Sequence, residues 1–348
     1  VASVSMQASR NGRKRDLRAS KNSIRISSPP MEVTAAGQPG PRDLSEIVGL
    51  VQLRLEQLVS QQEALTDSAQ LLRPVLLGGK LLRPSLCVLV CDALGGSRDH
   101  SIEAAVAVEL LHCAALLHDD VVDHHAHRRG RPSVCHEKGH ESALLLGDYA
   151  LGLAFTHAPG ATKDFLARCL VHLSQASLDE REFNRSRDSL QQIEVMAGKT
   201  GSLFELACTM GAVCAGQSPD RIAGFGRSLG IAYQIADDLV DIQQSLTRGA
   251  FRGDLRARHL SYPMLCVPPL HDLLQAYVEK SELDEEAFLQ LLRQFRCTDF
   301  ALEKIAIFQE MSLECLQDLR VHLSLSRFPY VAVSALLQES NGQVDSLH

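Results

Sequence analysis

Two segments of the sequence repeat the pattern Asp-Asp-x-x-Asp, and these carboxylates are the residues best suited to chemistry. The first segment is Asp119-Asp120-Val121-Val122-Asp123, and the second is Asp237-Asp238-Leu239-Val240-Asp241. In a helix, the first and last carboxylates of each segment lie on one face, one turn apart. Like charges at this spacing destabilise a helix unless a cation neutralises them. Paired oxygen ligands suit Mg²⁺, which takes one or two carboxylates together with substrate phosphates.

The presence of two such segments favours a diphosphate site over a solvated acidic surface. A single acidic helix end is common on surfaces, but here two lie far apart in the chain, each within an apolar helical pattern. On facing helices, they would hold a diphosphate between them through bridging ions. The metal charge would then stabilise the diphosphate as it leaves.

Basic residues beside glycine or acidic breaks could supply the cations that a diphosphate also needs. They are Lys80, Arg83, Arg128, Arg129 and Lys199. Arginine forks match phosphate oxygens, and lysine acts as a point charge. Each of these residues alone would pass for an ordinary surface residue, but their repeated placement favours a joint role. His112 lies two helical turns before Asp119 on the same face, and its role depends on its neighbours.

The surrounding pattern is helical from Leu44 onward. Apolar residues recur at helical spacing between Gly and Pro breaks, and no sustained period-two alternation occurs. We therefore predict an all-α fold: a single-domain helical bundle of about ten or more helices over residues 45–340, followed by a tail at 341–348. The ten cysteines lie in apolar segments without metal-site spacing, so we expect them to be reduced and mostly buried.

Residues 1–44 have a different composition. They are rich in Arg and Ser, and Asp16 is the one acidic residue before Met31. This composition predicts a disordered transit peptide, with a plastid favoured over a mitochondrion. A disordered tail without a targeting role is the alternative. The net charge of −7 argues against nucleic-acid binding, and no run of eighteen apolar residues predicts a transmembrane segment.

Several ordered motifs resemble the trans-type prenyl diphosphate synthases. The matching pieces lie between Leu77 and Pro263, with a weaker helical resemblance to about Leu337. Besides the acidic segments, they are Gly78-Gly79-Lys80-Leu81-Leu82-Arg83-Pro84, Glu109-Leu110-Leu111-His112, Arg128-Arg129-Gly130-Arg131-Pro132, Gly147-Asp148-Tyr149, Gly198-Lys199-Thr200-Gly201-Ser202-Leu203-Phe204 and Tyr233-Gln234-Ile235-Ala236. The resemblance implies the isoprenoid synthase fold, in which the helices surround a central cavity.

The resemblance also implies roles for individual residues. Mg²⁺ and the allylic diphosphate would be bound by Asp119, Asp120, Asp123, Asp237, Asp238 and Asp241. Lys199 and Arg128 would contact the same diphosphate. Isopentenyl diphosphate would be held by Lys80, Arg83, His112 and Arg129. Thr200 and Gln234 would line the reacting centre.

The implied reaction is a head-to-tail condensation of isopentenyl diphosphate with an allylic diphosphate. The allylic diphosphate ionises, the isopentenyl double bond attacks the cation, and the departed diphosphate removes a proton. The tail should then grow along the helix before Asp119. Ala114 and Ala115 are too small to block it, and Leu111 lies one turn further on. We therefore expect a product longer than farnesyl, either a medium or long chain such as solanesyl, or geranylgeranyl.

The sequence departs from the family pattern at three places, one of which is a shortened segment from Gly152 to Gly160. Leu81 stands where the family usually has a basic residue. The lysine expected after the second acidic segment is not evident, and Arg248, Arg252 and Arg258 are candidates for its charge.

Other functions stay open. A non-catalytic subunit of a heteromeric synthase is the main alternative, because Cys87 and Cys91 resemble a cysteine pair that such subunits carry. A terpene cyclase is disfavoured because aromatic residues are few and Trp is absent. The resemblance suggests a homodimer and does not exclude a heteromer.

Overall fold

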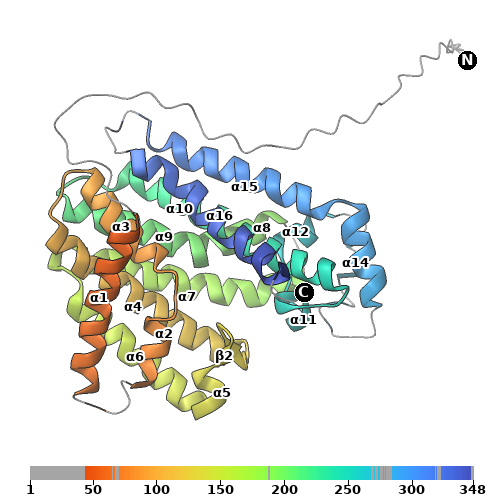
Figure 1. Ribbon diagram of the computed structural model, residues 1–348, viewed down its shortest axis with the longest axis horizontal. Coiled ribbons are helices and arrows are strands. Elements are labelled where there is room, and N and C mark those ends of the chain that lie inside the picture. Colours follow the sequence, from red (N-terminus) through yellow and green to blue (C-terminus); the bar gives the residue numbers. More distant parts are fainter. Residues whose placement is uncertain are drawn as a thin grey trace, which may run out of the picture. The chain divides into compact units, whose positions relative to one another are not determined.

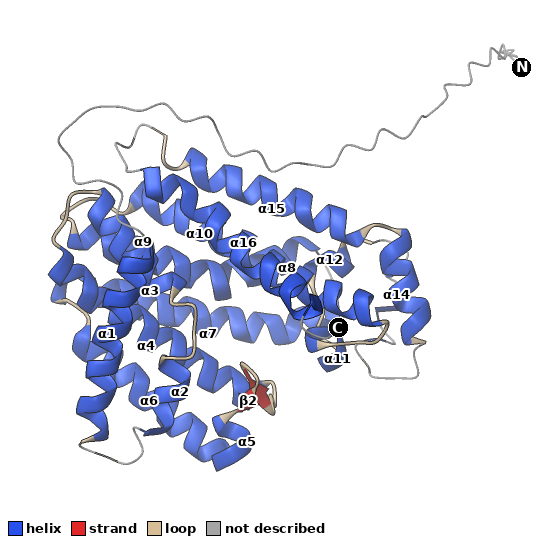
Figure 2. Ribbon diagram, viewed as in Figure 1, coloured by secondary structure: helices blue, strands red, loops and turns tan. Residues whose placement is uncertain are grey.

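The computed structural model describes most of the chain after residue 43. The described residues are 44–64, 66, 70–186, 189–267, 270, 273–274, 277, 279, 284–317, 319 and 323–345. The predicted transit peptide therefore lies outside the described residues, apart from Leu44. Residues 41–348 form one compact unit. Its described part is almost entirely helical (Figures 1 and 2), which confirms the all-α prediction.

The first half of the described fold is built around α4. Its elements are α1 (Leu44–Glu63), α2 (Leu72–Leu76), α3 (Leu82–Ala93), α4 (Arg98–Val122), β1 (His127–Arg128), β2 (Arg131–Pro132), α5 (Val134–Lys138), α6 (His140–His157) and η2 (Gly160–Thr162). The two strands form a small antiparallel hairpin. Helix α4 packs against α3, α6 and α9 (Ser202–Cys214).

Helix α1 shows how the sequence pattern produces this packing. Ile47, Val51, Leu55 and Leu58 recur at helical spacing and are all fully buried, so they form one apolar face against the core. Burying each such side chain contributes about 1.5–3 kcal/mol. The polar Arg54 on α1 then pairs with Glu103 on α4, at 2.6 Å between Nε and Oε1.

The second half of the described fold is organised by α10. Besides α9, its elements are α7 (Lys163–Ser186), α8 (Ser189–Met196), η3 (Ala197–Gly201), α10 (Asp220–Arg248), α11 (Gly253–Ala257), α12 (Tyr262–Leu265), α14 (Glu285–Gln294), α15 (Cys297–Glu314) and α16 (Leu323–Asp345). Helix α10 packs against α9, α15 and α16. Helix α16 continues to Asp345, past the predicted domain end at residue 340.

A π-helical turn, η3, interrupts the helix that runs from α8 into α9. Such turns insert a residue into a helix and redirect its side chains, and they often occur at functional sites. Close backbone contacts hold α10 beside this turn. A Cβ at Gly230 would lie 2.6 Å from the Cα of Gly201 and 2.9 Å from the carbonyl oxygen of Thr200. Glycine at residue 230 therefore lets α10 approach η3.

Helix α4 is also the one described helix that is long and apolar enough to cross a membrane. However, 67% of its most apolar 18-residue stretch is buried inside the fold. Burial at this level is typical of the central helix of a bundle. All ten cysteines are unpaired, and none is fully exposed, as expected from the sequence.

Candidate active site

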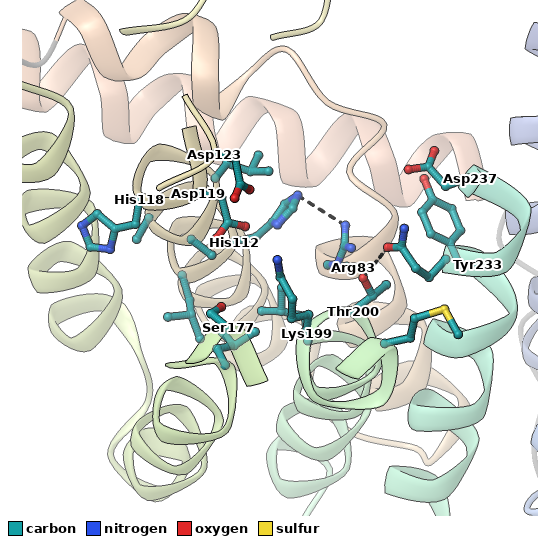
Figure 3. Close-up of a pocket in the computed structure, with 18 of the residues that line it drawn as sticks. Arg83, His112, His118, Asp119, Asp123, Ser177, Lys199, Thr200, Tyr233 and Asp237 are labelled. Atoms are coloured by element: carbon teal, nitrogen blue, oxygen red, sulfur yellow. Dashed lines mark hydrogen bonds between the residues drawn. The ribbon is translucent and has the colours of Figure 1, made fainter. Parts of the chain in front are cut away.

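A cavity of about 960 Å³ opens between α3, α4, α7, η3 and α10. Figure 3 shows its two sides. Asp119 and Asp123 come from the end of α4, Asp237 comes from α10, and Lys199 and Thr200 lie between them on η3. The fold therefore brings together on one cavity the two acidic segments that the sequence analysis singled out.

The first acidic segment divides its carboxylates between the cavity and the protein. Asp119 and Asp123 line the cavity. Asp120 is buried, and its Oδ1 accepts hydrogen bonds from the guanidinium of Arg128, at 3.0 Å from Nε. Nδ1 of His125 lies 3.5 Å from the same oxygen. Asp120 therefore holds Arg128 and its loop in place.

The environment of the Asp119 carboxyl favours a bound cation. Burial raises the pKa of its carboxyl, and nearby Asp123 and Glu180 raise it further, although Lys199 opposes them. The raised pKa means that the fold disfavours the ionised form. A divalent cation between Asp119 and Asp123 would relieve this crowding. These carboxylates therefore fit Mg²⁺.

The second acidic segment is arranged differently. Asp237 and Asp238 line the cavity. Asp238 is buried and accepts hydrogen bonds from Gln234 Nε2 at 2.9 Å and from the backbone N of Tyr262 at 3.1 Å. It thereby ties α10 to the start of α12. Asp241 is not among the cavity-lining residues. Its carboxylate lies beside Gly253, where an added Cβ would be 2.2 Å from Oδ2.

Lys199 projects from the π-helical turn into the cavity (Figure 3). Its Nζ donates a hydrogen bond to Glu180 Oε2 on α7 at 2.6 Å. Burial disfavours the ammonium, but the carboxylates of Asp119 and Glu180 outweigh this effect and raise the pKa of Lys199. The next residue, Thr200, donates from Oγ1 to Gln234 Oε1 at 2.6 Å. Both η3 residues therefore face the region between the acidic segments.

Arg83 and His112 form a second polar group in the cavity. Nη1 of Arg83 lies 3.3 Å from His112 Nε2, a contact drawn in Figure 3. Burial and the charge of Arg83 hold the pKa of His112 well below its usual value, so the ring is neutral. Because arginine only donates, Nε2 is the acceptor and Nδ1 carries the proton. Nδ1 is buried without a protein hydrogen-bond partner among the described residues.

Arg129 joins this group from the loop after α4. Its Nη1 donates to the carbonyl oxygen of Val75 at 3.1 Å. The guanidinium lies against the glycine pair before α3, where a Cβ at Gly79 would be 2.8 Å from Nη2. Lys80 also lines the cavity. The absence of a side chain at Gly79 therefore makes room for the guanidinium of Arg129.

Leu81, one of the departures from the family pattern, lies on the cavity wall in a left-handed conformation with φ of 53°. It is buried. A left-handed backbone costs a non-glycine residue about 1–2 kcal/mol, so the surrounding packing must hold this residue in place. The described structure gives no reason why a leucine occupies this position.

An apolar arm of the cavity runs along α4 away from the carboxylates. Leu111, Ala114 and Ala115 line it from α4. Leu151 of α6 and Leu170 and Leu173 of α7 also line the cavity. The predicted chain-length residues therefore belong to the apolar part of the cavity lining, where Leu111 and Ala114 are almost fully buried.

Sequence reasoning missed several polar residues that line the cavity, among them Glu109, Glu180 and His259. Burial raises the pKa of Glu109 to about 7, although the charges of Arg83 and Arg129 oppose the shift. Glu109 lies three residues before His112 and therefore on the same face of the helix, so this spacing could have identified it as a candidate site residue. Glu180 and His259 come from distant segments, and no local pattern points to either.

Comparisons with known proteins agree with this arrangement. The family model described as polyprenyl synthetase matches residues 67–293. Geranylgeranyl pyrophosphate synthase 3 of Arabidopsis thaliana, described as chloroplastic, is 31% identical over 240 residues, covering 62% of this chain and 67% of the relative. Across the first relatives found, the chain spans 64–67% of their own length.

Two solved structures share the fold. A decaprenyl diphosphate synthase from Rhodobacter capsulatus has a TM-score of 0.75 and 23% identity, covering 84% of this chain and 98% of that one. A polyprenyl synthase from Caulobacter crescentus, complexed with calcium and isoprenyl diphosphate, has a TM-score of 0.67 and 25% identity, covering 84% and 94%. On the family match and the shared fold, the chain belongs to the polyprenyl synthetase family, the trans-type prenyl diphosphate synthases.

Proposed function

We propose that this protein condenses isopentenyl diphosphate head-to-tail with an allylic diphosphate, giving a polyprenyl diphosphate longer than farnesyl. The observation that carries the proposal is the single cavity that joins Asp119, Asp123 and Asp237 to an apolar arm along α4. A polar end suits the diphosphate, and an apolar arm suits the growing hydrocarbon tail.

The proposed cofactor is Mg²⁺, held by Asp119 and Asp123 on one side and Asp237 on the other. Among the described residues, no group of three or more His, Cys, Asp or Glu side chains could hold a metal alone. This agrees with an ion that completes its shell with substrate phosphates. When bound, it would neutralise the leaving diphosphate. Whether Asp120, Asp238 and Asp241 also reach a metal is a separate prediction, because in this structure the first two are occupied by protein hydrogen bonds.

The chain's own residues would perform the remaining tasks. Lys199 and Arg128 would donate to the allylic diphosphate as its C–O bond breaks and the electron pair moves to the diphosphate oxygen. Arg83, His112, Lys80 and Arg129 would hold isopentenyl diphosphate. Its double bond would supply the electrons of the new C–C bond, and its lost proton would pass to the released diphosphate.

A direct assay tests the activity. The purified chain would be incubated with isopentenyl diphosphate and either farnesyl or geranylgeranyl diphosphate, with Mg²⁺ or with EDTA, and the products would be sized. We expect products only with Mg²⁺ and both substrates. Absence of product with every primer would instead favour the non-catalytic subunit. Cys87 and Cys91, which motivated that alternative, are both fully buried in this structure, so packing accounts for them.

Product length is a finer proposal that depends on the apolar arm. Ala114→Phe would place an aromatic ring in this arm, so we expect shorter products. Ala114→Gly is the matched control, because it leaves the arm open at a helix cost of about 1 kcal/mol. If Ala114→Phe left product length unchanged, the arm along α4 would not be the tail channel.

We also propose a homodimer, because α6 exposes apolar side chains on the side that faces away from the core. Ala143, Leu146 and Ala150 are buried, yet Leu145 is 69% exposed and Leu144 is 43% exposed. Adjacent exposed leucines on one helix favour a further partner surface. Light scattering of the wild type and Leu145→Lys would test this, and a monomeric wild type would contradict it. A heteromer would appear as binding to a second, different subunit.

The proposed location is a plastid. It is supported by the Arg- and Ser-rich composition of residues 1–44 and by the description of the first relatives as chloroplastic. A fluorescent fusion to residues 1–44 should enter plastids. Import into mitochondria would favour the alternative, and a cytosolic signal would contradict a targeting role.

A further inference from the structure

The loop after α10 lacks the lysine that the family resemblance leads one to expect, and the candidate arginines do not replace it in the cavity. The guanidinium of Arg258 lies over the rings of Phe251 and Tyr277, at 5.0 Å and 5.2 Å from their centroids. Arg248, the last residue of α10, is exposed. None of Arg248, Arg252 and Arg258 is among the cavity-lining residues.

His259 reaches the cavity instead. It lines the cavity together with Leu260. Its backbone carbonyl accepts a hydrogen bond from the buried hydroxyl of Tyr277 at 3.0 Å, which fixes this part of the loop. The ring of Tyr277 also lies beneath the guanidinium of Arg258. Arg258 therefore lies against Phe251 and Tyr277, whereas the next residue, His259, lines the cavity.

The neighbours of His259 identify the part of the cavity that it faces. Its ring centroid lies 5.7 Å from that of His125, in the loop after α4. Nδ1 of His125 lies 3.1 Å from Arg128 Nη2. The ring of His125 therefore neighbours both His259 and Arg128, the cation assigned to the allylic diphosphate, so His259 faces the loop after the first acidic segment.

We propose that His259 is a substrate-binding residue that donates an N–H to the allylic diphosphate. Imidazole has at least one N–H donor in either charge state, so the contact does not require protonation. The inference rests on the proposed function and adds one residue to the same site.

Affinity for inorganic pyrophosphate with Mg²⁺, measured by calorimetry, provides a test that does not depend on turnover. The variants are His259→Ala and His259→Lys. His100→Ala is the matched control, because His100 is exposed in the first turn of α4 and lies outside the cavity lining. Thermal unfolding of each variant would verify folding.

We expect His259→Ala to weaken pyrophosphate binding about tenfold, the effect of losing one hydrogen bond to a charged group. His259→Lys should bind at least as tightly as the wild type, and His100→Ala should match the wild type. In turnover, His259→Ala should raise the KM for farnesyl diphosphate and leave that for isopentenyl diphosphate nearly unchanged.

Three outcomes would overturn the inference. If the wild type forms product but His259→Ala binds pyrophosphate as the wild type does, His259 is not a diphosphate ligand and the proposed function stands. If His259→Lys binds more weakly than His259→Ala, an anion does not occupy this position. A wild type that neither binds Mg²⁺-pyrophosphate nor forms product would overturn the proposed function and this inference together.

Discussion

The two acidic segments have the same sequence pattern, but the fold uses them differently. At the end of α4, Asp119 and Asp123 both line the cavity. In the middle of α10, Asp237 and Asp238 line the cavity, while Asp241 lies against Gly253. A repeated motif therefore does not produce two equivalent arrangements of carboxylates.

The middle aspartates show the difference most clearly. Asp120 orients the guanidinium of Arg128, because it accepts hydrogen bonds from that group. Asp238 instead accepts hydrogen bonds from Gln234 and from the backbone N of Tyr262. The first segment thus positions a group that can contact substrate, and the second connects two helices. Removal of corresponding carboxylates should therefore change different properties of the protein.

The largest effect is expected from Asp119→Asn. Loss of this charge should lower kcat by about 10²–10³-fold, as for other groups that stabilise charge in a transition state. The thermal midpoint should not fall, because the raised pKa of Asp119 shows that the fold disfavours its ionised form. Steady-state kinetics and thermal unfolding would measure both. Activity within a few-fold of the wild type would remove Asp119 from the metal site.

Asp238→Ala should instead act mainly on stability. It removes the acceptor for the backbone N of Tyr262 and for Gln234, so we expect unfolding to become easier by about 1–3 kcal/mol. Chemical denaturation would measure this loss. Asp119→Asn is the comparison variant. Equal stability of the two variants would mean that Asp238 does not connect α10 to α12.

Glu180→Gln tests how Lys199, which lies between the two acidic segments, is held in place. The Lys199–Glu180 pair is partly exposed, so its loss should cost at most about 1 kcal/mol of stability. Lys199 would lose its partner on α7, and the KM for the allylic substrate should rise more than kcat falls. A large fall in kcat with unchanged KM would indicate that Glu180 acts in the transition state instead.

The smallest effect is expected from Asp241→Asn, because this carboxylate does not line the cavity. We expect less than about a tenfold change in kcat, well below the effect of removing a group that stabilises charge in the transition state. The same assays as for Asp119→Asn apply. A loss as large as that of Asp119→Asn would mean that the two segments become equivalent once metal and substrate bind.

Much of this protein could be predicted from local sequence. The helical periodicity of α1 and α4 predicted the all-α fold, because burial of one helix face leaves a regular pattern. The spacing of Asp119 and Asp123 predicted paired carboxylates for the same reason. The short hairpin β1–β2 was not predicted, since two-residue strands leave no periodic pattern.

The tertiary structure decided which of these residues face one another. The environment of Asp238 depends on the backbone of Tyr262, and that of Lys199 depends on Glu180 and a π-helical turn held by Gly230. The sequence alone determined the helices, the carboxylate pairs and the set of cations, because these follow from residues within a few turns. Only the packed fold decided which carboxylates line the cavity and placed His259 there, because those contacts join segments that are distant in the chain.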